Sequence, residues 1–377
     1  MTATTRSAAR KEGKSGGAPP AAQAHPGSKH KTGESAGSPG PKRSKKQEEK
    51  EQTTIDETIG HGVTKRKAQN GTKTGKQKTR GTKDGASAVE PEGRDESEQV
   101  PSSILEKGII YFFFRGRVGV DEPSDVNEIA RSHIILRPIE KDAKLGSGPI
   151  GDAGNTRVCV IPKKVLPQSG RERWTAFVEK SGASFQQLKE EFLSSSDYET
   201  KTAGTRHTPA ATPVGEGVYA ITSTGRESHL AYILTLPETP GEVQREMGLK
   251  EKGSFIISTK NPQYPGPANA RLPKPPEYPK ELLDEFRSLR WVPTQPKHLD
   301  YVNTQFLLVG ESSGLEKALA QQKEDQEEGK AEPAEEMEKL EEEDTKRMKD
   351  LSKDDSGRIF ADLQVHAGDY PKLQTTF

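Results

Sequence analysis

The chain has 377 residues with 57 basic and 57 acidic side chains, so its formal net charge is zero. Apolar residues make up 29 % of it, well below the ~45–50 % that is usual in globular proteins. Much of the chain therefore cannot belong to a core, and no apolar run approaches the ~20 residues that a membrane-spanning helix needs. Its single cysteine, Cys159, excludes an intramolecular disulfide and a cysteine-rich zinc site.

Charge is unevenly distributed along the chain. Residues 1–89 carry 19 Lys and Arg against 8 acids, whereas residues 316–355 carry 16 acids against 8 bases. The first aromatic residue is Tyr111. Residues 1–103 have too few apolar side chains to offset the ~1–2 kcal/mol per residue that ordering a backbone costs. We therefore expect a disordered basic tail over residues 1–103.

Two basic clusters in this tail resemble a bipartite nuclear import signal. Their residues are Lys42, Arg43, Lys45, Lys46, Lys65, Arg66 and Lys67. Basic side chains on a flexible chain also neutralise phosphates, which gives salt-sensitive binding to nucleic acid without sequence readout. The tail predicts a nuclear location, with the cytoplasm as the alternative, and nucleic acid as a partner. A solubilising linker is the simpler interpretation.

Folding is expected to begin at about residue 104. The first strand is predicted at Gly108–Val118, where β-branched and aromatic residues end in a glycine-containing turn. Further strands are predicted at 133–139, 157–165, 173–180, 215–223, 228–237, 253–262, 290–294 and 300–310. Short helices are predicted at 124–130 with Ser124 as N-cap, after Ser184, at 240–247 and at 278–289.

Two segments of the core are predicted to form loops. A polar linker is predicted at 194–213. Residues 262–279 hold too many prolines for a helix or a central strand, so we expect an extended surface loop. This loop contains a P-x-x-P pattern, Pro273 to Pro276, with Arg271 nearby, which matches a polyproline ligand weakly.

These elements predict one α+β domain over residues 104–312. It should hold a single mostly antiparallel sheet or a partly closed barrel, with about four short helices, between disordered tails. The acidic segment 313–355 is predicted to form an exposed helix with a break at Pro333, because its apolar residues are too sparse for a heptad seam. Residues 356–377 form a C-terminal tail that docks on the core, binds a partner or stays loose.

No motif of the core identifies a catalytic residue, a cofactor or a metal. The GSGPIG run at 146–151 has the spacing of a phosphate-binding loop, but Pro149 lies inside it and a strand follows instead of a helix. The histidines of the core do not show the spacing of a metal-binding helix. Cys159 lies in an apolar strand, which predicts a buried and unreactive thiol.

His133, His229 and Asp300 are the residues that we select as a candidate site if the core carries out chemistry. Both histidines follow a serine at the start of a predicted strand, and Asp300 precedes the last strand. A hydrogen-bonded structural imidazole or a surface carboxylate is the alternative at each position.

The order of the core segments resembles that of a known family. The segments YFFFRGRV, RSHIILRPI, VCVIPKKVLP, SHLAYILTLP and DYVNTQFLLVG look like those of fungal proteins that carry the label "BTB domain transcription factor", and similar cores occur in plant and bacterial proteins. The resemblance spans about residues 104–310. It implies a nuclear regulator, although the F-x-V-H-K type of segment of a BTB domain is not found here. No catalytic residue follows from it.

The sequence thus favours a non-enzymatic nuclear binding protein associated with transcription or chromatin, with a protein partner for the core. The alternative is a core that is an enzyme or a small-molecule-binding domain. A third hypothesis is an intramolecular switch in which the acidic segment covers the basic tail.

Overall fold

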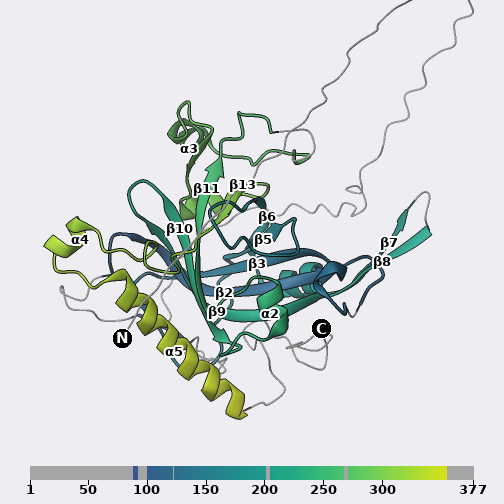
Figure 1. The fold of residues 1–377 in the computed structure, drawn as a ribbon, viewed down its shortest axis with the longest axis horizontal. Coiled ribbons are helices and arrows are strands. Elements are labelled where there is room, and N and C mark those ends of the chain that lie inside the picture. The colour runs from purple at the N-terminus through teal and green to yellow at the C-terminus, as the bar shows by residue number, and fades with distance from the viewer. Residues whose placement is uncertain (1–87, 92–99, 122, 201–203, 267–270, 355–377) are drawn as a thin grey trace, which may run out of the picture. The chain divides into compact units, whose positions relative to one another are not determined.

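The computed structural model describes residues 88–91, 100–121, 123–200, 204–266 and 271–354. The predicted basic clusters of the tail, and the C-terminal tail 356–377, lie outside these residues. The chain divides into units 1–78 and 79–377, and every described element belongs to the second unit. Figure 1 shows that strands dominate it.

Eight antiparallel strands form a closed barrel. In chain order they are β2 (Ile104–Gly116), β3 (Ile129–Ile139), β5 (Thr156–Ile161), β6 (Arg173–Ala183), β9 (Ala211–Ser223), β10 (Ser228–Leu236), β11 (Lys252–Lys260) and β13 (Gln305–Gly310). Around the barrel the order is β2-β3-β5-β6-β13-β11-β10-β9. Pairing of β9 with β2 and of β10 with β11 completes the ring. The predicted α+β class with an antiparallel sheet is confirmed, and the barrel is closed.

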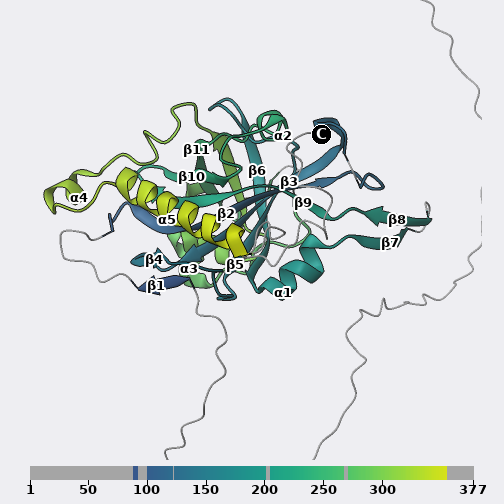
Figure 2. The same cartoon turned by 90° about the horizontal axis from the view of Figure 1, so that it is seen from below.

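Shorter elements surround the barrel. The remaining strands are β1 (Val89–Pro91), β4 (Ala143–Leu145), β7 (Ser196–Thr200), β8 (Gly204–Thr208) and β12 (Trp291–Pro293). The helical elements are η2 (Val126–Glu128), α1 (Phe185–Gln187), η3 (Leu188–Leu193), α2 (Glu242–Glu246), α3 (Lys280–Glu285), η5 (Pro296–Asp300), α4 (Lys323–Glu327) and α5 (Pro333–Asp354). In Figure 2 the β7-β8 hairpin extends away from the barrel.

The four aromatic residues at the start of the core, Tyr111 to Phe114, pack on both faces of the barrel wall. Side chains of a strand alternate between its two faces, so Phe112 and Phe114 belong to the interior cluster whereas Tyr111 and Phe113 belong to the cluster on the outer face. All four are at most 2 % exposed. This strand is therefore buried on both faces, which explains why its sequence is continuously apolar instead of alternating.

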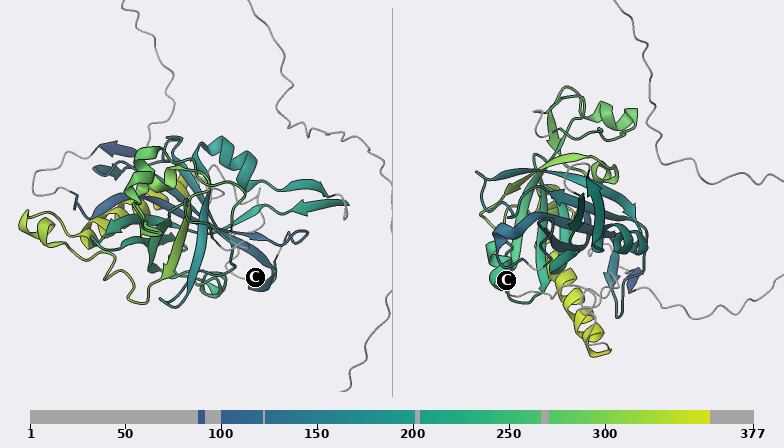
Figure 3. Two further views of the ribbon diagram at one scale, coloured as in Figure 1. Left: turned by 90° about the horizontal axis from the view of Figure 1, so that it is seen from above. Right: turned by 90° about the vertical axis from the view of Figure 1, so that its right-hand side faces the viewer.

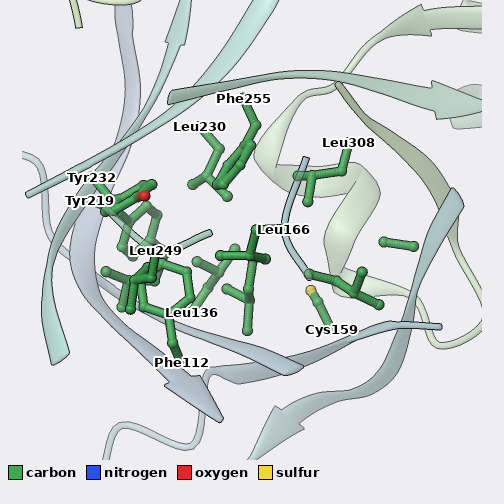
Figure 4. Packing of buried hydrophobic residues seen from close by; sticks show 14 of the residues in the cluster. Phe112, Leu136, Cys159, Leu166, Tyr219, Leu230, Tyr232, Leu249, Phe255 and Leu308 are labelled. Carbon is green, nitrogen blue, oxygen red and sulfur yellow. The ribbon is translucent and has the colours of Figure 1, made fainter. Parts of the chain in front are cut away.

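Side chains fill the barrel interior. Eight strands enclose a space just wide enough for side chains, and Tyr232 lies between Phe112 and Phe255 with ring centroids 5.1 and 5.7 Å away (Figure 4). The cavity left among the apolar residues at one end has a volume of about 10 Å³. Leu299 of η5 packs at this end, and residues of α2 such as Val243 join the cluster as well.

The acidic C-terminal segment is not the exposed helix that its composition predicts. α5 packs on β9, β10 and β4, and it buries Met337 and Leu340 in the outer cluster. The helix begins at Pro333, which agrees with the expected break. Three of its charged side chains, Glu336, Asp344 and Arg347, are at most 4 % exposed. The sequence prediction failed because these charges find partners on the barrel, so that few apolar residues suffice.

Other boundaries also differ from the sequence prediction. The expected linker 194–213 contains the β7-β8 hairpin and the start of β9. Asp125, not Ser124, caps the first helical turn, since its carboxylate accepts a hydrogen bond from the backbone N–H of Asn127. A strand, β1, lies within the segment 1–103 and pairs with β4. The predicted helix 278–289 ends at Glu285, and Arg287 has a left-handed backbone with φ of 50°.

Candidate functional site

The three core residues selected from the sequence do not form one site. His133 of β3 lies opposite Phe113 of β2, and Phe113 in turn lies opposite Pro213 of β9. His229 of β10 lies opposite Thr222 of β9. Nine residues of a strand separate these positions, a distance of about 30 Å at ~3.3 Å per residue. Asp300 ends η5. Each residue therefore has to be considered on its own.

Asp300 belongs to an ionic cluster at the η5 end of the barrel. Arg157 donates to Asp300 Oδ1 over 2.6 Å and to both carboxylate oxygens of Glu106 over 2.7 and 2.9 Å. Tyr219 Oη donates to Glu106 Oε1 over 2.7 Å. Burial and the Glu106 carboxylate raise the pKa of Tyr219 well above its usual range, so this hydroxyl stays protonated. Every charge in the cluster has a partner, which indicates a structural role.

His133 lines an open hollow of about 350 Å³ on the outer wall. Its ring packs against Phe192 of η3 with centroids 4.9 Å apart. Burial, together with the cations Arg115 and Arg131, holds its pKa well below the usual range. Its Nδ1 has no hydrogen-bond partner among the described residues. The hollow has mixed charge, because Glu179 and the Lys180–Glu191 ion pair also line it.

His229 is completely buried on the outer face of β10. Neither ring nitrogen has a hydrogen-bond partner among the described residues, and the nearest carboxylate, Glu227, is 3.9 Å away. Burial lowers the pKa of His229. A neutral imidazole with no access to solvent has no route to a substrate in this state.

A groove of about 250 Å³ lies beside the η5 end of the barrel, where β11 ends and β13 begins. We call it the cationic groove. It is lined by three cations, Lys260, Arg271 and Lys274, by the aromatic ring of Tyr264, and by a set of prolines and other uncharged residues. That set is Pro262, Pro265, Gly266, Leu272, Pro273, Pro275, Pro276, Asn303 and Gln305. Among the described lining residues there is no Asp or Glu.

A buried asparagine fixes the first half of the loop that forms this groove. Asn261 is completely buried directly after β11. Its backbone N–H donates to the carbonyl of Arg290 over 2.9 Å, and its Nδ2 donates to the carbonyl of Leu289 over 3.0 Å. Its Oδ1 accepts from the backbone N–H of Gln263 over 3.0 Å. Because all these bonds are satisfied away from water, this stretch has one defined path.

α3 supports the same region from outside the barrel. Tyr278, Leu282 and Phe286 form a small separate apolar cluster, and the Tyr278 and Phe286 rings stack with centroids 5.7 Å apart. Figure 3 shows α3 on one side of the barrel and α5 on the other. Tyr264 of the groove is bonded to this region, because its hydroxyl donates to the carbonyl of Ser288, just after α3, over 2.8 Å.

The charged side chains that line the cationic groove are all cations. Lys260 Nζ donates to Gln305 Oε1 over 2.9 Å, which is a neutral partner. Burial and the nearby guanidinium groups of Arg290 and Arg271 lower the pKa of Lys260. The cations therefore disfavour one another, and an anion placed among them would relieve the repulsion.

Sequence reasoning predicted the extended loop but not the site. Residues 260–274 contain one tyrosine, three basic residues, four prolines and no acid. In a chain with so many charged residues, the absence of acids from this stretch was the signal for a cationic site. The P-x-x-P pattern indicated a polyproline ligand instead. Proximity of Arg290 to Lys260 depends on the pairing of β12 with β11, which the sequence does not reveal.

Comparisons of the chain with protein-family models, with curated proteins and with solved structures gave no match. Within the described ranges, no group of three or more His, Cys, Asp or Glu side chains is arranged to hold a metal ion. None of the described helices is both long and apolar enough to cross a membrane.

Proposed function

We propose that this protein is a non-enzymatic nuclear binding protein that contacts nucleic acid through surface cations, with the barrel as a rigid scaffold. The observation that supports this most is the cationic groove, in which Lys260, Arg271 and Lys274 face no carboxylate among the described lining residues. A surface of one sign attracts a polyanion and speeds its encounter.

The basic tail supplies the second part of the proposal. Its predicted import signal would bring the chain to the nucleus, and its lysines and arginines would add affinity that depends on salt and not on sequence. The implied resemblance to fungal proteins labelled as transcription factors agrees with this role. A protein partner of the core, also expected from the sequence, would bind on the outer surface, since side chains fill the interior.

The test is a binding titration of the full chain against duplex and single-stranded oligonucleotides at two salt concentrations. A matched variant would carry glutamine at the seven tail positions, Lys42, Arg43, Lys45, Lys46, Lys65, Arg66 and Lys67. We expect the full chain to bind, and the variant to bind more weakly. Absence of binding to any nucleic acid at low salt would contradict the proposal.

The second candidate function is a small-molecule-binding or enzymatic core. It is favoured by the hollow at His133, because a buried imidazole with an unpartnered Nδ1 is a group that a ligand could complete. A ligand screen by thermal shift would test it. A hit whose stabilisation disappears in a His133→Phe variant, and persists in a His229→Phe variant, would support this candidate.

A further inference from the structure

Tyr264 is an exposed aromatic ring that is held in place at both ends. Its side chain is 36 % exposed. At its tip, Oη donates to the carbonyl of Ser288 over 2.8 Å, and at its base the backbone N–H donates to the carbonyl of Asn261 over 3.1 Å. An aromatic ring fixed in this way loses little entropy when a flat group stacks on it.

The cations around this ring are suited to phosphate. The Arg271 guanidinium donates one N–H to the carbonyl of Gly266 over a long distance of 3.4 Å. A guanidinium has five N–H donors in all. Lys274 is exposed and makes no hydrogen bond or ion pair with the described residues. The Tyr264 ring and the three cations line the same groove, so a single ligand can contact both.

The size of the groove restricts the form of the ligand. Pockets for drug-sized ligands measure about 300–1,000 Å³, so a groove of about 250 Å³ accepts a group of the size of one nucleotide. In a duplex the base faces are stacked on one another and cannot reach a ring in such a groove. A single strand presents each base face together with its phosphate.

We propose that the cationic groove binds single-stranded nucleic acid, with one base stacked on Tyr264 and the neighbouring phosphates at Arg271, Lys274 and Lys260. This inference rests on the proposed function and names the ligand form and the site. An acidic peptide would use the cations but gain nothing from the ring, which distinguishes the two ligands.

The experiment measures binding of the full chain to a fluorescent oligothymidine of twelve nucleotides, with an oligo-glutamate peptide and a duplex of equal length as comparison probes. The variants are Tyr264→Ala, Tyr264→Phe and Arg271→Glu. The matched controls are Tyr198→Ala, which removes a tyrosine that is 44 % exposed on the β7-β8 hairpin, and Arg226→Glu in the exposed turn between β9 and β10.

We expect the single strand to bind more tightly than the duplex. Loss of one stacked base should weaken binding of Tyr264→Ala by about 5- to 150-fold, while Tyr264→Phe retains most of the affinity. Arg271→Glu should weaken binding to a similar extent, and both control variants should bind like the wild type. Because all four positions are exposed, circular dichroism should show the wild-type fold in each of the five variants.

A second readout locates the contact directly. Ultraviolet crosslinking of a bromouracil-substituted strand, followed by trypsin digestion, should label the peptide of residues 261–271, which contains Tyr264 between two cleavage sites. Labelling confined to residues 1–87, with unchanged affinity in Tyr264→Ala and Arg271→Glu, would overturn this inference and leave the proposed function intact. Binding of oligo-glutamate that Arg271→Glu abolishes and Tyr264→Ala does not affect would overturn it in favour of an acidic peptide. Failure of every nucleic acid to bind would overturn both.

Discussion

Lys107 of β2 donates to Glu336 of α5 over 2.7 Å, and the two side chains are only 2 % and 4 % exposed. This pair joins the first strand of the barrel to a helix 229 residues later. A second buried group supports the same contact: Arg347 binds Asp344 at 2.5 Å and Glu216 of β9 at 3.4 Å. The acidic helix is thus part of the folded unit, and its charges specify where it packs.

Removing one partner of the buried pair should destabilise the protein strongly. Lys107→Met leaves the Glu336 carboxylate buried without its cation, which typically costs ~3–5 kcal/mol of unfolding free energy. Urea denaturation measures this change. Lys297→Met is the control, because Lys297 and Glu285 form an exposed pair, 48 % and 45 % accessible, whose loss costs at most ~1 kcal/mol. Equal effects in the two variants would contradict burial of α5 on the barrel.

Gly253 should be required for closure of the barrel. It lies opposite Tyr232 in the pairing of β10 with β11, and an added Cβ would come within 2.6 Å of the Tyr232 hydroxyl. We expect Gly253→Ala to lower stability by ~1–3 kcal/mol through overpacking. Gly170→Ala, at a site with no atom within 4 Å of the added carbon, should leave the urea midpoint nearly unchanged. Tolerance of both changes would mean that this seam is open.

The Cys159 thiol should be inert in the native protein. It is 1 % exposed, and burial raises its pKa to about 12, so almost no thiolate forms at pH 8. A thiol-reactive dye should label the protein only after unfolding in urea. Rapid labelling of the native chain at pH 8, at the rate of a small free thiol, would contradict the packing of the interior.

The base of the β7-β8 hairpin should respond to pH through His207. Its ring lies 2.6 Å from Asp197 and 2.9 Å from Asp121, and the hydrogen bond to Asp197 comes first among the interactions that raise its pKa. A raised folded-state pKa stabilises the contact fully below the unfolded value of ~6.5, and this contribution disappears as pH rises through the folded value. Protection of the amides in residues 196–200 and 204–208, measured relative to the intrinsic exchange rate at each pH, should therefore fall above that value, and His207→Gln should remove this fall. The same pH profile of protection in both proteins would exclude this role.

The fold was largely predictable because it rests on local patterns, whereas the placement of charges was not. Short apolar runs rich in β-branched and aromatic residues, bounded by turn residues, located nearly every barrel strand, as for Phe255 to Ile257 of β11. The composition of α5 suggested exposure, since Met337 and Leu340 alone are too few to bury a helix. What buries it is pairing with Lys107 and Glu216, which are distant in sequence and unremarkable as local residues.

The same limit applies to the candidate sites. His133, His229 and Asp300 were selected as polar residues at strand starts, and the structure places them at separate positions with separate partners. The cationic groove depends on the fold bringing residues of 260–266 and 271–276 beside Asn303 and Gln305. The prolines predicted an extended backbone for this segment, but not that its cations would line one groove.

The most direct test of nucleic-acid binding by the core is the salt dependence of the affinity for a single strand. It should be measured for the full chain and for the Arg271→Gln/Lys274→Gln double variant between about 50 and 200 mM salt. Each lost phosphate contact reduces the magnitude of the slope of log K against log salt concentration by ~0.7 for single strands, so we expect the magnitude for the double variant to be smaller by about 1.4. An unchanged slope would contradict it, because the tail alone would then supply every phosphate contact.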